Sequence, residues 1–223
     1  MRQFSLAVSE MATIAGQTYV RCGNTEIAPV PGQVYLARAA TPEQPFLRVP
    51  LYPYSTSGTG IEFCLGSFPH PYADLEPGAA LDLIGPVGRG FILPPRATHV
   101  LVWCHSPARL LGLIYQALDR RFAVTFLLPA DALLPELPLE VEVQREPLTP
   151  ELALWADMAA LDLPDPLDQA RELRALCLPR PAEFVQALIT PPMPCGTGAC
   201  QACWVELGHG RKLACVDGPV FEL

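Results

Sequence analysis

Four cysteines near the carboxyl end of the chain have the spacing of a metal-binding loop. Cys195, Cys200 and Cys203 follow the pattern Cys-x4-Cys-x2-Cys, and Cys215 comes after eleven further residues. Four thiolates on one short segment are the ligands that a 2Fe–2S cluster needs, and the first three have the plant-type ferredoxin spacing. The spacing therefore predicts an iron–sulfur cluster at this end of the chain.

The loop between the first two cysteines is rich in glycine. Gly196 and Gly198 can adopt backbone conformations closed to other residues and can bring amide N–H groups close to the sulfurs. Zinc is the main alternative, although structural zinc sites usually pair two short Cys knuckles and this segment contains one. Disulfides or free thiols are a second alternative. The remaining cysteines have mostly apolar neighbours, and we expect them to be buried: Cys22, Cys64, Cys104 and Cys177.

The same segment resembles the C-terminus of dihydroorotate dehydrogenase electron-transfer subunits, which belong to the ferredoxin–NADP reductase-like flavoproteins. The resemblance rests on Met193-Pro194 before the cysteines and on the run from Asp217 to Phe221 after them. It implies a 2Fe–2S cluster that passes electrons between an FAD in the same subunit and a flavin in a partner catalytic subunit. It thus implies a hetero-oligomer with a role in pyrimidine biosynthesis.

Composition excludes several classes of function. The 223 residues suit two small domains plus an appendage, and the net charge of −8 comes without a visible basic patch, so we expect no nucleic-acid binding. There is no signal peptide and no apolar run long enough to span a membrane, so we expect a cytoplasmic protein. The 26 prolines are scattered, which favours short elements joined by stiff turns.

Three regions follow from the hydrophobic pattern and the resemblance. Residues 1–95 predict an FAD-binding-type, six-stranded antiparallel β-barrel, with strands at 4–8, 18–22, 33–38, 46–50, 60–64 and 80–84. Residues 96–188 predict a Rossmann-like α/β domain of the NAD-binding type, with strands at 98–103, 122–128, 141–144 and 184–189 and helices at 110–118, 148–161 and 168–176. Residues 189–223 predict a small 2Fe–2S module with a hairpin of 204–207 and 211–215.

The flavin motifs of the family are incomplete here. The family usually has Arg-Pro-x-Ser on a barrel strand, but alignment on Pro50 leaves both polar residues missing, and Arg48 stands one place early. A shift of one residue on a strand points a side chain to the opposite face. Tyr54 and Ser55 are candidate remnants of this motif. The second flavin motif is replaced by the proline-rich segment 64–71, whose prolines cannot donate N–H groups to a pyrophosphate.

A glycine-rich turn is the other candidate flavin contact. Gly85, Gly88 and Gly90 lie where the family has Gly-Pro-Leu-Gly-x-Gly-Phe, and the alternative is a turn that needs glycine for its own geometry. FAD is therefore kept as an alternative cofactor.

We expect no NAD(P) site. In doubly wound sheets the pyrophosphate binds between the first strand and its helix, where the resemblance implies Gly-Gly-Gly-x-Gly. Residues 103–109 contain no glycine, and their bulky side chains and Pro107 should keep phosphates from the backbone. Arg109, at the start of the helix, is expected to be exposed to solvent.

The favoured interpretation is an electron-transfer component without an active site of its own. By resemblance, its partner is a flavin-containing oxidoreductase such as the catalytic subunit of a dihydroorotate dehydrogenase. A complete FAD and 2Fe–2S reductase subunit is one alternative. A non-redox protein with a four-cysteine zinc site is the other.

Overall fold

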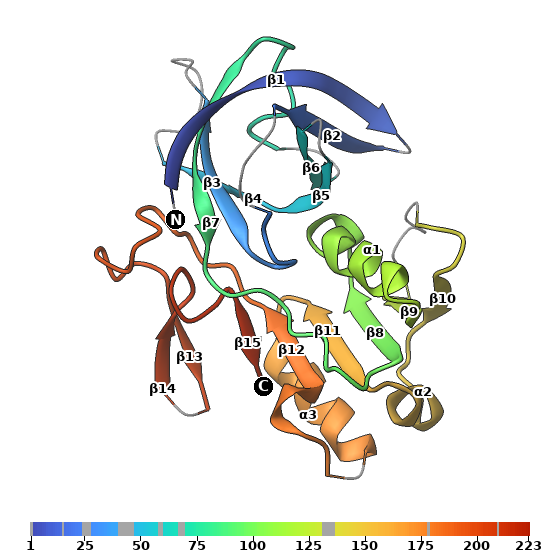
Figure 1. Ribbon diagram of the computed structural model, residues 1–223. Helices are drawn as coiled ribbons and strands as arrows, with labels where there is room; N and C mark the ends of the chain where they lie inside the picture. Colours follow the sequence, from blue (N-terminus) through green and yellow to red (C-terminus); the bar gives the residue numbers. More distant parts are fainter. Residues whose placement is uncertain are drawn as a thin grey trace.

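The computed structural model describes residues 2–14, 16–23, 28–39, 47–57, 60–66, 70–130, 137–177, 179–208 and 210–223. Figure 1 shows a curved sheet above a second, helix-flanked sheet, with a small hairpin beside the second sheet. The predicted fold class is confirmed: an antiparallel β-barrel, a Rossmann-like α/β lobe and a small C-terminal cysteine segment.

The first lobe is a nearly closed antiparallel barrel. Its sheet has the order β4-β3-β7-β1-β2-β6-β5. The strands are β1 (Arg2–Ile14), β2 (Gln17–Cys22), β3 (Val34–Ala39), β4 (Val49–Leu51), β5 (Pro53–Ser57), β6 (Gly60–Gly66) and β7 (Ala80–Val87). Only Tyr52 separates β4 from β5, so the two edges of the sheet meet in one interrupted strand. Each of the six predicted strands overlaps an observed strand, the fourth (46–50) at Val49–Leu51, with residue 46 outside the described ranges. β5, which begins at a proline that cannot donate to a ladder, was not predicted.

The second lobe is a sheet of order β10-β9-β8-β11-β12-β15 in which every pairing except that of β15 is parallel. Its strands are β8 (His99–Cys104), β9 (Ala123–Leu128), β10 (Glu142–Arg145), β11 (Met158–Asp162), β12 (Val185–Leu188) and β15 (Val220–Glu222). Its helices are η1 (Pro107–Arg109), α1 (Leu111–Asp119), α2 (Pro150–Trp155), α3 (Pro166–Leu176) and η2 (Ala182–Phe184). The predicted β-α-β unit is thus β8, α1 and β9.

One predicted helix is wrong in its second half. The helix expected at 148–161 ends at Trp155, and Met158–Asp162 forms β11 in the centre of the sheet. All five residues of β11 are buried. A strand covered on both faces is a continuous apolar run, which periodicity cannot distinguish from a buried helix.

The C-terminal segment contacts both lobes. Its predicted hairpin is present as β13 (Trp204–Leu207) and β14 (Gly210–Leu213). The tail continues into β15, which pairs with β12. On the barrel side, the backbone N–H of Arg89 donates to the carbonyl of Gly218. Because β15 belongs to the second sheet, residues 189–223 share packing with the α/β lobe.

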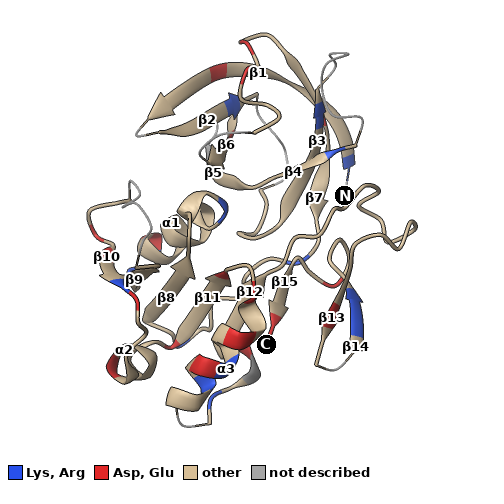
Figure 2. Ribbon diagram, turned by 180° about the vertical axis from the view of Figure 1, so that it is seen from behind, with Lys and Arg blue, Asp and Glu red and all other residues tan. Residues whose placement is uncertain are grey.

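Two wider expectations concern the molecular surface. None of the helices in the described ranges is long and apolar enough to cross a bilayer. Figure 2 shows Lys and Arg residues spread over both lobes among acidic residues, in line with the absence of a basic patch in the sequence.

Gly88 is one of the residues at which the barrel contacts the C-terminal tail, and its replacement tests this contact. It has φ +79°, and a Cβ there would collide with the carbonyl of Gly218. We expect Gly88→Ala to lower the free energy of unfolding by about 2–4 kcal/mol, measured by denaturant titration.

Gly16→Ala is the matched control for this measurement. Gly16 has a similar φ of +76° but nothing within 4 Å of an added Cβ, so only the conformational cost of about 1 kcal/mol is expected. Equal losses in the two variants would show that the contact between Gly88 and Gly218 adds nothing.

Candidate metal centre

The cysteine loop is shaped by residues in left-handed backbone conformations. Gly196 and Gly198 have φ of +69° and +79°, and Gln201 has φ 55°. The side-chain amide of Gln201 donates to the carbonyl of Gly198 at 2.6 Å, which closes the turn before Cys203. A Cβ on Gly196 would lie 2.8 Å from Cδ1 of Leu36 in the barrel. These glycines therefore allow both the tight turns and the close approach of the loop to the barrel.

Two of the predicted ligands are already adjacent. The sulfur atoms of Cys203 and Cys215 lie 3.3 Å apart, and both residues are buried. The N–H of Ala214 donates to the carbonyl of Cys203 at 2.9 Å, so the returning hairpin brings Cys215 to this position. Two thiolates on one tetrahedral metal with bonds of about 2.3 Å lie roughly 3.8 Å apart. The observed spacing needs only a small adjustment to match that value.

The other two predicted ligands lie on the outer side of the loop. Cys195 is partly buried and Cys200 is exposed. Backbone N–H groups of Cys200 and Thr197 lower the pKa of Cys195 to about 6, because they stabilise its thiolate. The N–H of Thr197 lies 3.4 Å from the Cys195 sulfur. Such N–H groups are the interactions that tune sulfur ligands in iron–sulfur proteins.

On the inner side of the loop, the surroundings raise the pKa of a ligand thiol and do not lower it. Burial, and then the neighbouring Cys203, raise the pKa of Cys215 to about 12. A cation placed between these sulfurs would reverse the effect, because a coordinated thiol is deprotonated. Among the described residues no three Cys, His, Asp or Glu side chains share one metal-binding position, so the full ligand set remains a prediction from residue type and loop geometry.

Asp217 supports the turn that carries Cys215. Its carboxylate accepts the N–H of Leu213 at 2.9 Å, and its own N–H donates to the Leu213 carbonyl at 2.7 Å. This pair of bonds fixes residues 213–217 next to the loop. Hydrogen bonds of this kind around a ligand residue hold it in the orientation that metal binding needs.

The remaining cysteines behave as the sequence predicts, with one exception. Cys22, Cys64 and Cys104 are buried, and burial raises the pKa of each, to about 12 for Cys22. Cys177 is only partly buried, and its thiol donates to the carbonyl of Ala153 at 3.2 Å. These four thiols lie outside the cysteine loop and are separate from the candidate centre.

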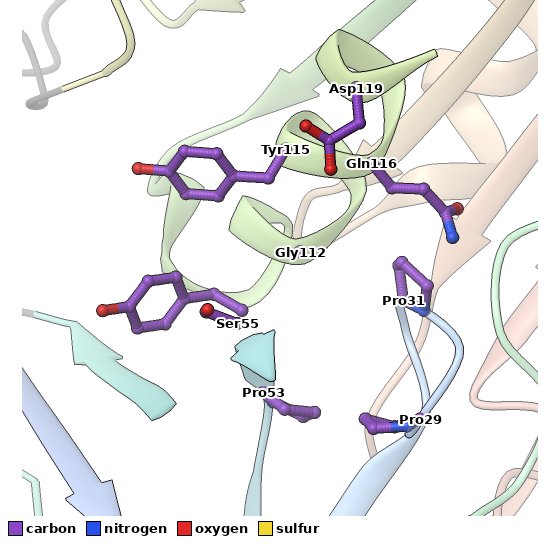
Figure 3. A pocket seen from close by; sticks show the side chains of 9 residues that line it. Pro29, Pro31, Pro53, Ser55, Gly112, Tyr115, Gln116 and Asp119 are labelled. Carbon is purple, nitrogen blue, oxygen red and sulfur yellow. The ribbon is translucent and has the colours of Figure 1, made fainter. Parts of the chain in front are cut away.

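The candidate flavin residues on β5 line a cavity between the two lobes. Tyr54 and Ser55 face Gly112 and Tyr115 of α1 across a cavity of about 380 Å³. Figure 3 shows the side chains of Tyr115, Gln116 and Asp119 on α1 opposite Ser55 and three proline rings. The rings of Tyr54 and Tyr115 are 6.1 Å apart, and burial raises the pKa of the Tyr54 hydroxyl. The cavity is large enough to contact an aromatic ring system, but its lining among the described residues includes no cation.

The candidate glycines lie elsewhere. A Cβ on Gly85 would collide with the ring of Tyr35, and one on Gly90 with the carbonyl of Pro31. Gly88 meets the C-terminal tail, as described above. None of these three glycines lines the cavity of Tyr54 and Ser55. The structure therefore does not bring the two groups of candidate flavin contacts together, and the turn supports chain packing instead.

Arg48 is also engaged within the barrel. Its guanidinium donates to the carboxylate of Asp82 and, at 2.7 Å, to the Asp82 carbonyl. Its side chain is only 11% exposed. An arginine held this way by β7 is not free to bind the pyrophosphate of a flavin cofactor.

The expectation that Arg109 is exposed to solvent is met only in part: 40% of its side chain is accessible, but the guanidinium is engaged by other residues. Its guanidinium forms a bidentate ion pair with the Asp162 carboxylate, in which Nε donates to Oδ2 at 2.8 Å and Nη2 donates to Oδ1. Its Nη1 donates to the hydroxyl oxygen of Thr190 at 2.6 Å. It also lies over the ring of Tyr52, 5.7 Å from the centroid. Burial raises the pKa of Asp162, and the adjacent guanidinium opposes this shift. Sequence reasoning missed this cluster because Asp162 lies 53 residues away, at the end of the strand that was predicted as helix.

Comparisons with solved structures show the fold that this chain shares with other proteins. One similar chain comes from a structure of the NADH-dependent reduced ferredoxin-NADP oxidoreductase. The match covers 97% of this chain and 87% of that chain, with a TM-score of 0.75 and 19% sequence identity. The match to the ferredoxin reductase of carbazole 1,9a-dioxygenase covers 83% of this chain and 66% of that chain, with a TM-score of 0.61 and 16% identity. The match to phthalate dioxygenase reductase covers 84% of this chain and 68% of that chain, with a TM-score of 0.55 and 15% identity. The chain thus has the ferredoxin reductase-like fold.

The particular resemblance predicted from the sequence is confirmed for the cysteine segment. Residues 191–223 match the family described as the iron–sulfur cluster binding domain of dihydroorotate dehydrogenase B. No curated protein is significantly similar in sequence to the chain. The chain is therefore similar to dihydroorotate dehydrogenase electron-transfer subunits, with an iron–sulfur binding domain at its C-terminus.

Differences in exposure predict the order in which the thiols react. In cluster-free protein, iodoacetamide should first modify Cys200, which is exposed, and Cys195, whose pKa is lowered to about 6, and should leave Cys22 and Cys104 unmodified until the chain unfolds. Peptide mass spectrometry after timed alkylation measures this order. Modification of Cys22 at the same rate as Cys200 in folded protein would contradict the structure.

Proposed function

We propose that this chain is an iron–sulfur electron-transfer subunit that exchanges electrons with a partner flavin oxidoreductase. In this proposal a 2Fe–2S cluster is bound by Cys195, Cys200, Cys203 and Cys215. The observation that carries the proposal is the single loop that presents all four thiols, in a segment that matches an iron–sulfur binding family.

The chemistry of the loop supports the cluster. Four thiolates, glycine turns and N–H groups directed at sulfur match what a 2Fe–2S cluster requires. When bound, the cluster supplies one-electron transfer. The protein supplies the ligands, sets the potential through the N–H groups near Cys195, and holds the loop against both lobes. A zinc site would use the same four thiols, but zinc has no redox chemistry and would not transfer electrons.

The surface around the outer ligands supports a protein partner. Trp204 and Val216 are each 48% exposed beside the cysteine loop. The guanidinium of Arg211 lies over the Trp204 ring at 4.5 Å. Exposed tryptophan and arginine are the residues most often found at the energetic centre of protein interfaces. Together with the exposed Cys200, they favour docking of the partner on this side, by resemblance the catalytic subunit of a dihydroorotate dehydrogenase.

Replacement of one outer ligand tests the cluster directly. We expect Cys200→Ser to lose the visible absorption bands and most of the iron and acid-labile sulfide that wild-type protein holds after anaerobic reconstitution. Because ligation orders the loop, we also expect residues 190–223 to exchange amide hydrogens faster in this variant.

Cys177→Ser is the matched control, since it removes a partly buried thiol outside the loop. It should keep the wild-type content of iron and sulfide. A normal cluster spectrum in Cys200→Ser would contradict the ligand assignment. One zinc per chain with no sulfide in wild-type protein would replace the redox proposal with the structural zinc alternative.

A second candidate function is a complete reductase subunit that binds FAD. The cavity formed by Tyr54, Ser55 and Tyr115 favours it, because the apposed aromatic rings could contact a flavin. The engagement of Arg48 with Asp82 and the packing of the glycine turn against the C-terminal tail oppose it. A pyrophosphate needs a cation or free N–H groups, which these residues do not offer.

A flavin titration distinguishes the two candidates. If the cavity does not bind FAD, the fluorescence of added FAD should show no saturable quenching below about 100 µM protein. Saturable quenching that is lost in Tyr54→Ala, and kept in the distant exposed variant Trp204→Ala, would establish the reductase alternative.

A further inference from the structure

The crevice at the carboxyl ends of the second sheet contains an ion pair of the protein itself. In sheets of this kind, ligands bind where the strand order reverses. The reversal lies between β8 and β11, and Arg109 follows β8 while Asp162 ends β11. The crevice has a volume of about 930 Å³. Small-molecule sites occupy roughly 300–1,000 Å³, so volume alone does not exclude a ligand.

Asp162 makes the crevice unfavourable for phosphates. It is 6% exposed, and it receives Nε and Nη2 of Arg109. The fork of N–H groups that could bind a phosphate is therefore used by a carboxylate. A buried negative charge at this position would also repel the pyrophosphate of a dinucleotide.

The turn after β8 offers few backbone donors. Pro107 has no N–H, and the N–H of Ala108 points to the hydroxyl oxygen of Ser106 at 3.5 Å. The N–H of Leu110 donates to the carbonyl of Pro107 at 2.8 Å. A pyrophosphate at the start of a helix depends on free N–H groups, and at Pro107, Ala108 and Leu110 these are absent or already engaged.

Arg109 also fixes the segment that leads to the cysteine loop. Its Nη1 donates to the hydroxyl oxygen of Thr190 at 2.6 Å, and residues 188–191 line the crevice. Its guanidinium contacts the ring of Tyr52 between β4 and β5. This one side chain thus contacts the barrel, the α/β lobe and the segment that leads to Cys195.

We propose that the Arg109–Asp162 pair occupies the dinucleotide position of this fold, excludes ligands that contain a pyrophosphate, and instead anchors the approach to the cysteine loop. Asp162 is the residue that determines the exclusion, because it both repels phosphate and engages the guanidinium. The exclusion does not depend on the proposed function, since it requires neither the cluster nor a partner.

Calorimetric titration with ADP-ribose and with inorganic pyrophosphate tests the proposal. Wild-type protein should show no saturable binding of either below about 1 mM. Asp162→Asn keeps the shape of the side chain, removes its charge and releases Arg109. We expect it to bind pyrophosphate at least about tenfold more tightly than wild type, and we expect the added change Arg109→Gln to abolish this gain.

Asp168→Asn is the control, because it removes one negative charge from an exposed pair on α3. It should leave pyrophosphate binding unchanged, which separates a local effect from that of net charge. Saturable binding of ADP-ribose to wild type at micromolar concentrations would overturn the proposal. Equal pyrophosphate affinities of folded Asp162→Asn and wild type would also overturn it, and if that variant does not fold, the wild-type titration decides alone.

Discussion

Backbone hydrogen bonds between β12 and β15 hold the two ends of the cysteine segment together. The N–H of Ile189 donates to the carbonyl of Pro219 at 2.8 Å, and the N–H of Leu223 donates to the carbonyl of Val185 at 3.0 Å. The loop that carries all four cysteines lies between these ends, so its base is closed by a sheet. The hairpin and the Asp217 turn then bring Cys215 to Cys203. The position of the candidate centre thus depends on this pairing before any metal binds.

Local signals in the sequence predicted the parts of the structure that local forces determine. Ligand spacing, glycine turns and the hairpin lie within a few residues of each other, and their chemistry can be interpreted directly. The strands of the barrel and the first β-α-β unit follow from short apolar runs between turns. The family resemblance of the cysteine segment also rests on contiguous residues.

The parts that sequence analysis missed depend on distant contacts. β11 has the pattern of a helix because both of its faces are covered, and β5 contains a proline and polar residues. The partners of Arg48 and Arg109 lie 34 and 53 residues away in the chain. In each case the decisive neighbour is brought in by tertiary packing, which no local pattern reports.

Three residues in or beside the segments where the resemblance implies cofactor contacts are engaged in internal contacts here. Arg48 pairs with Asp82, Gly88 contacts Gly218, and Arg109 pairs with Asp162. Buried or half-buried polar groups need hydrogen-bond or ion-pair partners. In this chain other residues of the protein are those partners, so the groups stabilise packing between the lobes and do not contact a ligand. This pattern is consistent with a scaffold in which the cysteine segment carries the chemistry and the two lobes hold it in position.

The addition of β15 to the second sheet has a consequence for protein engineering. In the sequence, residues 189–223 look like a separate module that could be transferred to another protein. Their last strand, β15, however covers the edge of β12. Removal of residues 189–223 would leave the backbone N–H and C=O groups of the β12 edge unpaired, and an exposed strand edge is a template for aggregation. A graft of the cysteine loop onto another scaffold would therefore have to include a recipient strand equivalent to β12.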